Sequence, residues 1–262
     1  MKQDALSIKQ INNFQKQQYE DYERNSANSL LKKYTSILEK FKNKNNLKIL
    51  DVGGASGYFA QALLDYFDNG GGGGWGINIF VVDYVMYDTW KTNNGKITFI
   101  ESSVEKLREL FTHETFDIIF ANRVFHHFVG KTWKDTIKGI YQITGSITGL
   151  LKNDGCFCIT DYFYDGYFFD TSASRIIYAF TSCKIPILVS IFRKIEAKSA
   201  GVGVCFLSKK MWLRLFESHG LIVDNLYEGY KCKKSLRMII YGIFLLLKNL
   251  QEDNVMILKK SV

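Results

Sequence analysis

Short apolar runs alternate with helix-spaced apolar stripes through the centre of the chain. The runs that favour buried strands span residues 47–51, 77–82, 96–100, 116–121 and 156–161. Between them, apolar residues recur three or four positions apart, as in Phe59, Leu63 and Phe67, which is typical of amphipathic helices. Strands that alternate with helices in this order predict a doubly wound α/β fold with a mostly parallel sheet.

The two ends of the chain add further elements. Residues 1–46 predict mostly helix, with Ser29 as an N-cap and one apolar stripe formed by Leu30, Tyr34, Ile37, Leu38 and Phe41. Another helix is predicted to begin after Ser208 and to end at Gly220. Residues 221–226 and 255–258 favour the final strands.

Length and composition favour one domain. The chain has 262 residues, 47% of them hydrophobic, and a single proline, so it can bury a full core and has no proline-rich linker. Its 5 cysteines form no C-x-x-C pair and are expected to be small core residues in a reducing compartment. Residues 1–13 are polar and charged and predict no secretory signal. We therefore expect a cytoplasmic protein.

The formal net charge of +8 raises the question of an anionic partner. The lysines are scattered and no nucleic-acid recognition motif accompanies them, so a solvated basic surface is favoured over nucleic-acid binding. The apolar segment 238–247 has basic residues on both sides but is too short to span a bilayer. A buried helix, a homodimer face and an interfacial membrane contact all stay open for it.

The stretch 47–60 ends a strand in a carboxylate and a glycine turn. Asp51 begins a D-x-G-x-x-x-G arrangement that runs to Gly57, and a helix follows. Small residues there let backbone N–H groups at a helix N-terminus approach a ligand closely. A dinucleotide fingerprint is disfavoured, because Ala55 and Tyr58 stand where its second and third glycines would be. The carboxylate instead suits a ligand with an ammonium group, such as S-adenosylmethionine (SAM).

This arrangement resembles the first motif of class I SAM-dependent methyltransferases, which usually reads D-x-G-x-G-x-G. Asp51, Gly53 and Gly57 match the motif, and Ala55 replaces its middle glycine. The resemblance implies that the methionine end of SAM is held by Asp51, Gly53, Gly54, Ala55 and Gly57. An ordinary strand-to-helix turn is the competing interpretation.

The resemblance also implies a layout for the chain. The expected fold is a Rossmann-like sheet of seven strands with an antiparallel edge strand. Residues 1–46 would form a helical lid that includes Tyr19 and Tyr22, 47–161 the SAM-binding core, 162–207 a substrate-covering insertion, and 208–262 a helix with edge strands. The five glycines at 70–74 predict a loop, since no Lys-Ser or Lys-Thr pair follows them as a phosphate site requires.

Further cofactor residues are expected where later strands end. Asp83 ends the second strand, where a carboxylate can accept hydrogen bonds from both ribose hydroxyls, and Tyr84 follows it. In the resembled family, residues in the positions of Ser103 and Val104 hold the adenine, and serine here replaces the usual acid. Asn122 follows the fourth strand and is implied to line the cofactor.

Two adjacent histidines, His126 and His127, are the candidate catalytic residues. With Asn122 they form an N-x-x-x-H-H segment that resembles quinone-biosynthesis and other small-molecule methyltransferases. A neutral imidazole can take a proton from a hydroxyl or amine during methyl transfer. A pair that only fixes the loop by hydrogen bonds is the alternative. No metal site is expected, because no cysteine spacing supports zinc.

Together the motifs predict a SAM-dependent methyltransferase that releases S-adenosylhomocysteine. Its acceptor would be an O, N or C atom of a small aromatic or apolar metabolite, because aromatic residues crowd the region 162–169. Completion of the core is the alternative for that region. A membrane-surface lipid or quinone methyltransferase and a non-catalytic SAM-binding protein remain alternatives, and an NAD-dependent oxidoreductase is less favoured.

Overall fold

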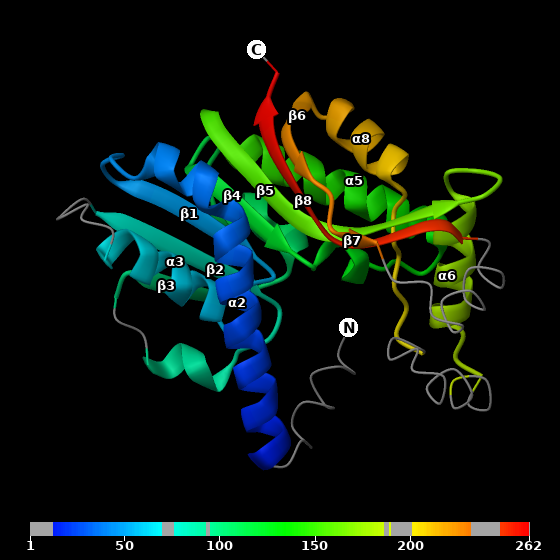
Figure 1. Cartoon of the computed structure of the whole chain (residues 1–262), viewed down its shortest axis with the longest axis horizontal. Coiled ribbons are helices and arrows are strands. Elements are labelled where there is room, and N and C mark those ends of the chain that lie inside the picture. The colour runs from blue at the N-terminus through cyan, green and yellow to red at the C-terminus, as the bar shows by residue number, and fades with distance from the viewer. Residues whose placement is uncertain are drawn as a thin grey trace. The chain divides into compact units, whose positions relative to one another are not determined.

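The computed structural model describes residues 13–69, 76–92, 95–185, 189, 201–231 and 247–261 (Figure 1). Within these ranges, the side chains of 13–22, 69, 91–92 and 230–231 are left undescribed. The predictions for the glycine run 70–74, for the apolar segment 238–247, and for the side chains of Tyr19 and Tyr22 therefore lie outside the described residues.

One mixed sheet carries the fold. Its strands are β1 (Leu47–Val52), β2 (Ile77–Asp83), β3 (Ile97–Glu101), β4 (Phe116–Asn122), β5 (Leu151–Gly166), β6 (Leu221–Tyr227), β7 (Tyr230–Lys231) and β8 (Leu247–Lys260). They follow the order β3-β2-β1-β4-β5-β8-β6, and the short β7 pairs with β8 beside this path. β1 is parallel to β2 and β4, whereas β8 is antiparallel to β6. The predicted doubly wound sheet with an antiparallel edge strand is thereby confirmed.

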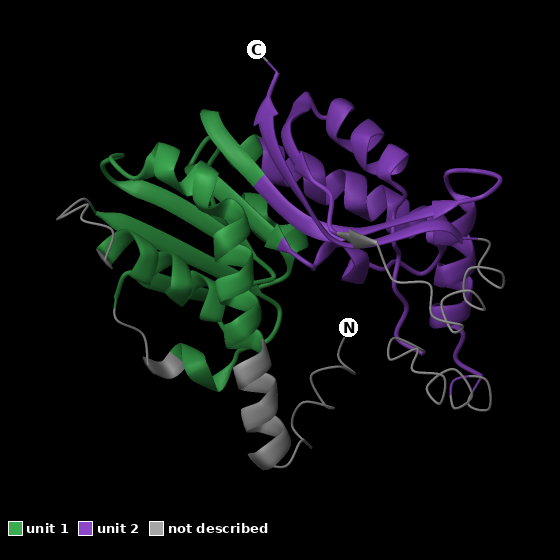
Figure 2. Cartoon of the chain, in the orientation of Figure 1, with its two compact units in different colours: residues 1–121, 149–157 green, residues 122–148, 158–262 purple. Residues whose placement is uncertain are grey.

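Two compact units divide the chain (Figure 2). Unit 1 comprises Met1–Ala121 and Gly149–Phe157, and unit 2 comprises Asn122–Thr148 and Cys158–Val262. β4 and β5 each continue from one unit into the other. The predicted single-domain layout, with its lid, core, insertion and C-terminal part, stays a prediction.

Helical segments connect the strands. They are α2 (Asn13–Phe41), α3 (Tyr58–Asn69), η1 (Asp88–Thr92), η2 (Val104–Lys106), α4 (Leu107–Leu110), η3 (Phe125–His127), α5 (Trp133–Leu150), α6 (Ser172–Ser182) and α8 (Lys209–Glu217). The predicted apolar stripe of α2 is buried. Ser208 caps α8 as predicted, since its hydroxyl accepts a hydrogen bond from the Met211 N–H at 3.2 Å. None of the described helices has both the length and the apolar character needed to cross a membrane.

Two local predictions are wrong. Ser29 is no N-cap, because α2 begins at Asn13 and passes through Ser29 without interruption. The preceding residues are rich in Gln, Glu and Arg, which favour helix. The strand predicted over 156–161 begins earlier, at Leu151, so Asn153, Asp154 and Gly155, whose residue types predict a turn before it, lie within β5 instead. A Cβ at Gly155 would lie 2.9 Å from the carbonyl oxygen of Asp117, so close packing against β4 explains the glycine better than turn formation does.

Aromatic packing in unit 1 joins three of its elements. Tyr34 of α2, Phe59 of α3 and Phe120 of β4 contact one another edge to face, with ring centroids 4.9 to 6.1 Å apart. β1 is buried at every position except Lys48, as expected of a strand covered on both faces. The end of β1 and the start of α3 are therefore enclosed by packed side chains.

Candidate functional site

The turn after β1 depends on its small residues. The backbone angle φ is +69° at Gly53, +47° at Ala55 and +83° at Gly57, which is the left-handed region. At Gly54 a Cβ would lie 2.5 Å from Oδ2 of Asp51, and at Gly57 a Cβ would lie 2.5 Å from an aromatic ring of β3. The glycines of the motif are therefore required by the conformation and the packing of the turn.

Asp51 carries an uncompensated carboxylate beside this turn. Its side chain is 1% exposed, and its Oδ2 has no hydrogen-bond partner among the described residues. Burial raises the pKa of Asp51 to about 7, and the neighbouring Asp83 carboxylate contributes to the increase. Burying a charge without a partner is unfavourable, so a positive group of a ligand would stabilise this carboxylate. The ammonium or sulfonium group of SAM fits this requirement.

A second buried aspartate of unit 1 differs in this respect. Asp117 on β4 is fully buried, but its Oδ1 lies 2.8 Å from Nζ of Lys152 and 2.9 Å from Nζ of Lys44. Its Oδ2 accepts a hydrogen bond from the Lys48 N–H at 2.8 Å. Burial alone would raise the pKa of Asp117, yet these donors lower it below its usual value. Asp117 is therefore satisfied by its neighbours, whereas Oδ2 of Asp51 has no partner among the described residues.

Asp83 ties the end of β2 to the same turn. Its Oδ2 accepts a hydrogen bond from the Ala55 N–H at 3.0 Å, and its Oδ1 accepts one from the Val85 N–H at 3.2 Å. Burial raises the pKa of Asp83, and these N–H groups partly offset the increase. The Tyr84 N–H donates to this carboxylate as well, so one of its roughly four acceptor positions stays available, which is compatible with a contact to one ribose hydroxyl. The link to the turn is an additional function that the sequence did not indicate.

Three further residues hold the turn and were missed by sequence reasoning. Trp90 Nε1 donates to the Ala55 carbonyl at 2.9 Å, and Thr89 Oγ1 donates to the Ser56 carbonyl at 2.7 Å. Glu23 of α2 accepts a hydrogen bond from the Ser56 hydroxyl. The one signal was a lone tryptophan in a polar segment, which did not indicate a partner. Contacts from η1 therefore fix two carbonyls of the turn, and α2 binds its Ser56 hydroxyl.

Replacing Ala55 by glycine should stabilise the turn. A non-glycine residue in the left-handed region costs about 1–2 kcal/mol, and the greater freedom of glycine in the unfolded chain removes about half of that gain. We expect the Ala55→Gly variant to gain about 0.5–1 kcal/mol in unfolding free energy, measured by urea denaturation. Gly139→Ala, at an uncrowded helical position, serves as the reference substitution. A destabilised Ala55→Gly variant would show that the methyl group makes a contact the turn requires.

The remaining predicted cofactor residues of unit 1 follow β2 and β3. Ser103 caps η2, and its hydroxyl accepts a hydrogen bond from the Glu105 N–H at 3.4 Å. Val104 is buried, whereas Tyr84 is exposed. Because capping uses only one acceptor site of the Ser103 hydroxyl, a contact to adenine stays compatible with it. The assignments of Tyr84, Ser103 and Val104 stay predictions.

The two predicted catalytic histidines lie on η3 of unit 2 in different environments. His126 is buried, and its Nδ1 lies 2.9 Å from Oδ1 of Asp161 on β5. The same oxygen accepts a hydrogen bond from the Tyr162 N–H at 2.8 Å, while Oδ2 of Asp161 is buried without a partner among the described residues. His127 is exposed, with its ring centroid 4.1 Å from that of His126. The carboxylate thus orients His126, and sequence reasoning had not assigned Asp161 this contact.

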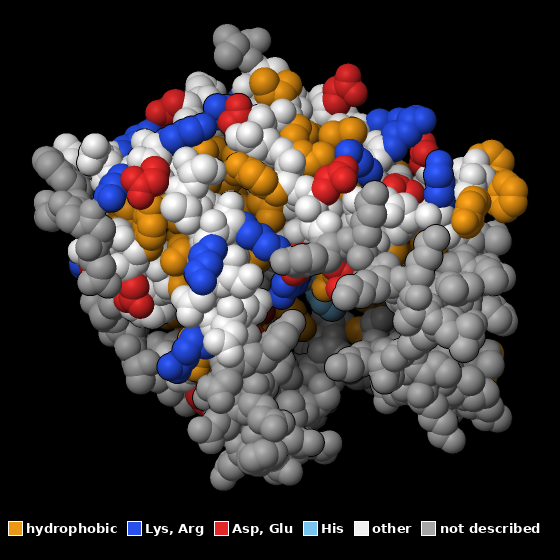
Figure 3. All heavy atoms as spheres, in the orientation of Figure 1, with side chains coloured by type: hydrophobic (Ala, Val, Ile, Leu, Met, Phe, Trp, Pro, Cys, Tyr) orange, Lys and Arg blue, Asp and Glu red, His pale blue; other side chains and the backbone are white. Residues whose placement is uncertain are grey.

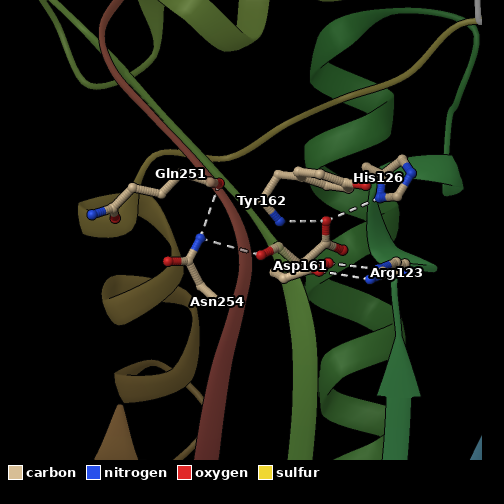
Figure 4. A network of polar contacts seen from close by, with 7 residues as sticks. Arg123, His126, Asp161, Tyr162, Gln251 and Asn254 are labelled. Atoms are coloured by element: carbon tan, nitrogen blue, oxygen red, sulfur yellow. Dashed lines mark hydrogen bonds and ion pairs between the residues drawn. The ribbon is translucent and has the colours of Figure 1, made fainter. Parts of the chain in front are cut away.

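A polar network supports Asp161 (Figure 4). Asn254 of β8 donates from Nδ2 to the carbonyl of Asp161 at 3.3 Å and to that of Gln251 at 3.0 Å. Arg123 forms a two-point ion pair with Asp253 at 2.6 and 2.7 Å. Both residues of this pair have left-handed backbones, with φ of +53° and +57°. The ion pair therefore holds two strained backbone positions next to the His126–Asp161 pair.

Aromatic side chains surround His126. The ring of Phe206 stacks on His126 with centroids 5.0 Å apart and on Tyr164 with centroids 4.4 Å apart. Tyr162 meets both His126 and Phe206 edge to face. We call Tyr162, Tyr164 and Phe206 the aromatic wall; all three are half-buried. A planar apolar molecule could extend this stack.

The other predicted features near these histidines are less defined. Asn122 is the last residue of β4 and is half-buried, and its cofactor contact stays a prediction. Among the residues that the structure describes, no three His, Cys, Asp or Glu side chains are grouped so that they could hold a metal ion.

Comparisons with known proteins agree with this reading of the turn and the sheet. A sequence model of the methyltransferase domain family matches residues 20–225. No curated protein matches the chain in sequence.

Solved structures share the fold at low sequence identity. A SAM-dependent methyltransferase from Archaeoglobus fulgidus has a TM-score of 0.55 and 14% identity, over 90% of this chain and 94% of that chain. A putative sarcosine dimethylglycine methyltransferase from Galdieria sulphuraria has a TM-score of 0.53 and 14% identity, over 87% and 83%. The 1,6-didemethyltoxoflavin-N1-methyltransferase of Burkholderia thailandensis, with bound S-adenosylhomocysteine, has a TM-score of 0.52 and 13% identity, over 92% and 79%.

The family match covers most of the chain and includes the glycine turn and both predicted histidines. The uncompensated carboxylate of Asp51 independently fits a cationic cofactor. The resemblance to quinone-biosynthesis enzymes in particular stays a prediction. The chain therefore belongs to the methyltransferase domain family, as a class I methyltransferase whose cofactor is SAM.

Proposed function

We propose that this methyltransferase acts on a hydroxyl group of a small planar, aromatic or apolar acceptor. The observation that carries the proposal is the buried pair of His126 and Asp161 beside the aromatic wall. An acceptor hydroxyl must lose its proton when its oxygen gains a methyl group, so a positioned base is useful for this acceptor class. Of the O, N and C acceptor atoms expected from the sequence, this proposal selects oxygen.

The hydrogen bond to Asp161 selects the tautomer that His126 needs. A carboxylate accepts the Nδ1–H of a neutral imidazole, and the lone pair of the ring then lies on Nε2. His126 would take the acceptor proton at Nε2 while the acceptor oxygen forms its bond to the methyl carbon. The imidazolium produced would be stabilised by Asp161 and would return its proton to solvent after the product leaves.

The cofactor residues act by binding and orientation. Asp51 would pair with the positive methionine end, and the backbone of the glycine turn would approach the ligand closely. SAM supplies a methyl group that its sulfonium already activates. Methyl transfer from SAM depends chiefly on the positioning of the two reactants. Binding alone can therefore support some turnover, and base catalysis by His126 would increase it.

A screen of acceptors tests the proposal. The purified protein is incubated with SAM and separate probes: catechol, hydroquinone, indole, aniline, benzoate and dimethylglycine. Release of S-adenosylhomocysteine and an O-methyl product are measured by mass spectrometry. We expect turnover with the hydroxylated rings, and methylation confined to aniline, indole, benzoate or dimethylglycine would contradict the oxygen acceptor.

Calorimetry together with this screen distinguishes two alternatives from the proposal. If calorimetry shows that SAM binds but none of the probes is methylated in a wider screen of hydroxylated compounds, a non-catalytic SAM-binding protein replaces the proposal. An NAD-dependent oxidoreductase would instead bind NAD in the same calorimetric titration.

A further inference from the structure

We propose that the loop between β5 and α6 inserts aromatic side chains into the surface of an anionic lipid membrane. Tyr167, Phe168 and Phe169 in this loop are 63%, 72% and 74% exposed. These are the largest exposed fractions among the described large hydrophobic residues. Figure 3 shows hydrophobic side chains gathered at the edge of the surface where Figure 1 places this loop. We call residues 167–169 the aromatic loop.

The backbone on both sides of the aromatic loop is firmly held. Before the loop, Asp165 Oδ1 accepts a hydrogen bond from the Lys209 N–H at 3.0 Å. At its end, the Phe169 carbonyl accepts hydrogen bonds from the N–H of Ser172 at 3.0 Å and from its hydroxyl at 2.8 Å. The exposed aromatic side chains are therefore presented by an ordered turn. Proteins seldom expose adjacent large apolar side chains unless these contact a partner.

Cationic side chains lie next to the aromatic loop. Asp170 Oδ2 lies 3.4 Å from Nζ of Lys210 and 3.2 Å from Nη1 of Arg214 on α8. The side chains of Lys210 and Arg214 are 62% and 56% exposed. Asp165 and Asp170 on either side of the aromatic loop carry two formal negative charges, whereas Lys210, Arg214 and the exposed Arg175 of α6 carry three positive ones, so these five side chains have a formal net charge of +1. This arrangement complements anionic headgroups, as does the net charge of +8 of the whole chain.

The form of the aromatic loop favours a lipid surface over a protein surface. Consecutive side chains in a turn point in different directions, so a protein partner would need a separate pocket for each ring. The acyl chains and headgroups of a membrane surface can adapt to all three rings. Aromatic residues beside cations are also the typical composition of membrane-surface contacts. The inference rests on exposure and charge alone and holds whether or not the acceptor proposal is correct.

Vesicle flotation tests the inference with the full chain. The probes are phosphatidylcholine vesicles and vesicles that also contain phosphatidylglycerol, each at low and high salt. We expect the protein to float with the anionic vesicles, less so at high salt, and only weakly with phosphatidylcholine. A protein that stays in the dense fraction under all four conditions would overturn the inference.

Substitutions locate the contact. The double variant Phe168→Ser, Phe169→Ser should need at least about tenfold more anionic lipid for half-maximal binding, because most of the apolar contact is lost. The matched control, Leu110→Ser with Ile222→Ser, removes two partly exposed apolar side chains from α4 and β6 and should bind as the original chain does. Circular dichroism and SAM titration verify that both variants are folded.

Two further results would also overturn the inference. If the double variant binds vesicles as strongly as the original chain, another surface makes the contact. If sedimentation equilibrium without lipid shows a dimer that the double variant abolishes, the aromatic loop is a contact between two copies of this chain.

Discussion

The Asp51→Asn variant is expected to lose SAM affinity and to become more stable without ligand. A hydrogen bond to a charged group contributes about 1.5–3 kcal/mol, so SAM affinity at pH 8 should fall at least about tenfold. The pKa of Asp51 rises from 3.8 to about 7 on folding, which corresponds to a cost of roughly 4 kcal/mol for the buried charge at pH 8. Asparagine removes that charge, so the unfolding free energy should rise by up to this amount.

The two effects are measured separately, by isothermal titration with SAM and by urea unfolding of the ligand-free protein. A loss of SAM affinity together with a gain in unfolding free energy would indicate that the buried charge serves to bind the ligand. If Asp51→Asn destabilised the ligand-free protein and left SAM affinity unchanged, the carboxylate would serve the fold instead of the cofactor.

The pH dependence of the original chain follows from the same pKa. Because folding raises the pKa of Asp51, its contribution to stability is complete below about pH 4 and is lost as the pH rises through about 7. SAM binding needs the carboxylate, so affinity should decrease as the pH falls below about 7. The Asp51→Asn variant should show neither change, and a urea-unfolding and calorimetric series between pH 5 and 8 compares the two proteins.

Asp117→Asn is the matched control for this prediction. Its carboxylate is also buried in unit 1 but has lysine and backbone partners, which lower its pKa. Removal of a charge with partners leaves donors unpaired, so we expect a loss of stability at pH 8. SAM affinity of the folded Asp117→Asn variant should be nearly unchanged, because Asp117 is no part of the proposed cofactor site.

The second large effect is expected for His126 and Asp161. General base catalysis contributes about a hundredfold to ten-thousandfold, so His126→Ala should lower kcat by at least about a hundredfold with weakly acidic hydroxyl acceptors. Asp161→Asn should also lower kcat, because the neutral amide stabilises the imidazolium of His126 less than the carboxylate does. His127→Ala is the matched control and should keep most of the activity, since its ring is exposed and lacks the hydrogen bond to Asp161.

Acceptors of different acidity show whether the His126–Asp161 pair has a chemical or a structural function. An acceptor that is already ionised at pH 8, such as 4-nitrocatechol, needs no base, so both substitutions should reduce its turnover far less than that of catechol. An equal loss for the two acceptors would indicate that the His126–Asp161 pair only maintains the fold. Nitrogen NMR of histidine-labelled protein provides a check without any acceptor, because the Nδ1–H signal of His126 should be present in the original chain, and an Nε2–H signal in its place would contradict the orientation by Asp161.

Strand positions and the glycine turn could be predicted because they depend on local sequence. Apolar runs such as 77–82 became strands at nearly the predicted bounds, since a parallel strand that is buried on both faces is mostly apolar. The two wrong predictions were also based on local sequence. Ser29 and residues 153–155 have the local chemistry of a cap and a turn, but long-range packing placed them inside a helix and a strand.

The sequence by itself determined the family and the residues around the turn, because Asp51, Gly53 and Gly57 lie within seven positions and one strand-turn-helix unit positions them all. Only the tertiary structure decided that Oδ2 of Asp51 has no partner among the described residues, that Trp90 holds the turn, and that His126 rather than His127 is bound to Asp161. These facts depend on burial and on contacts between residues that are 35 positions apart in the sequence. The local spacing of residues does not show which distant residues come into contact.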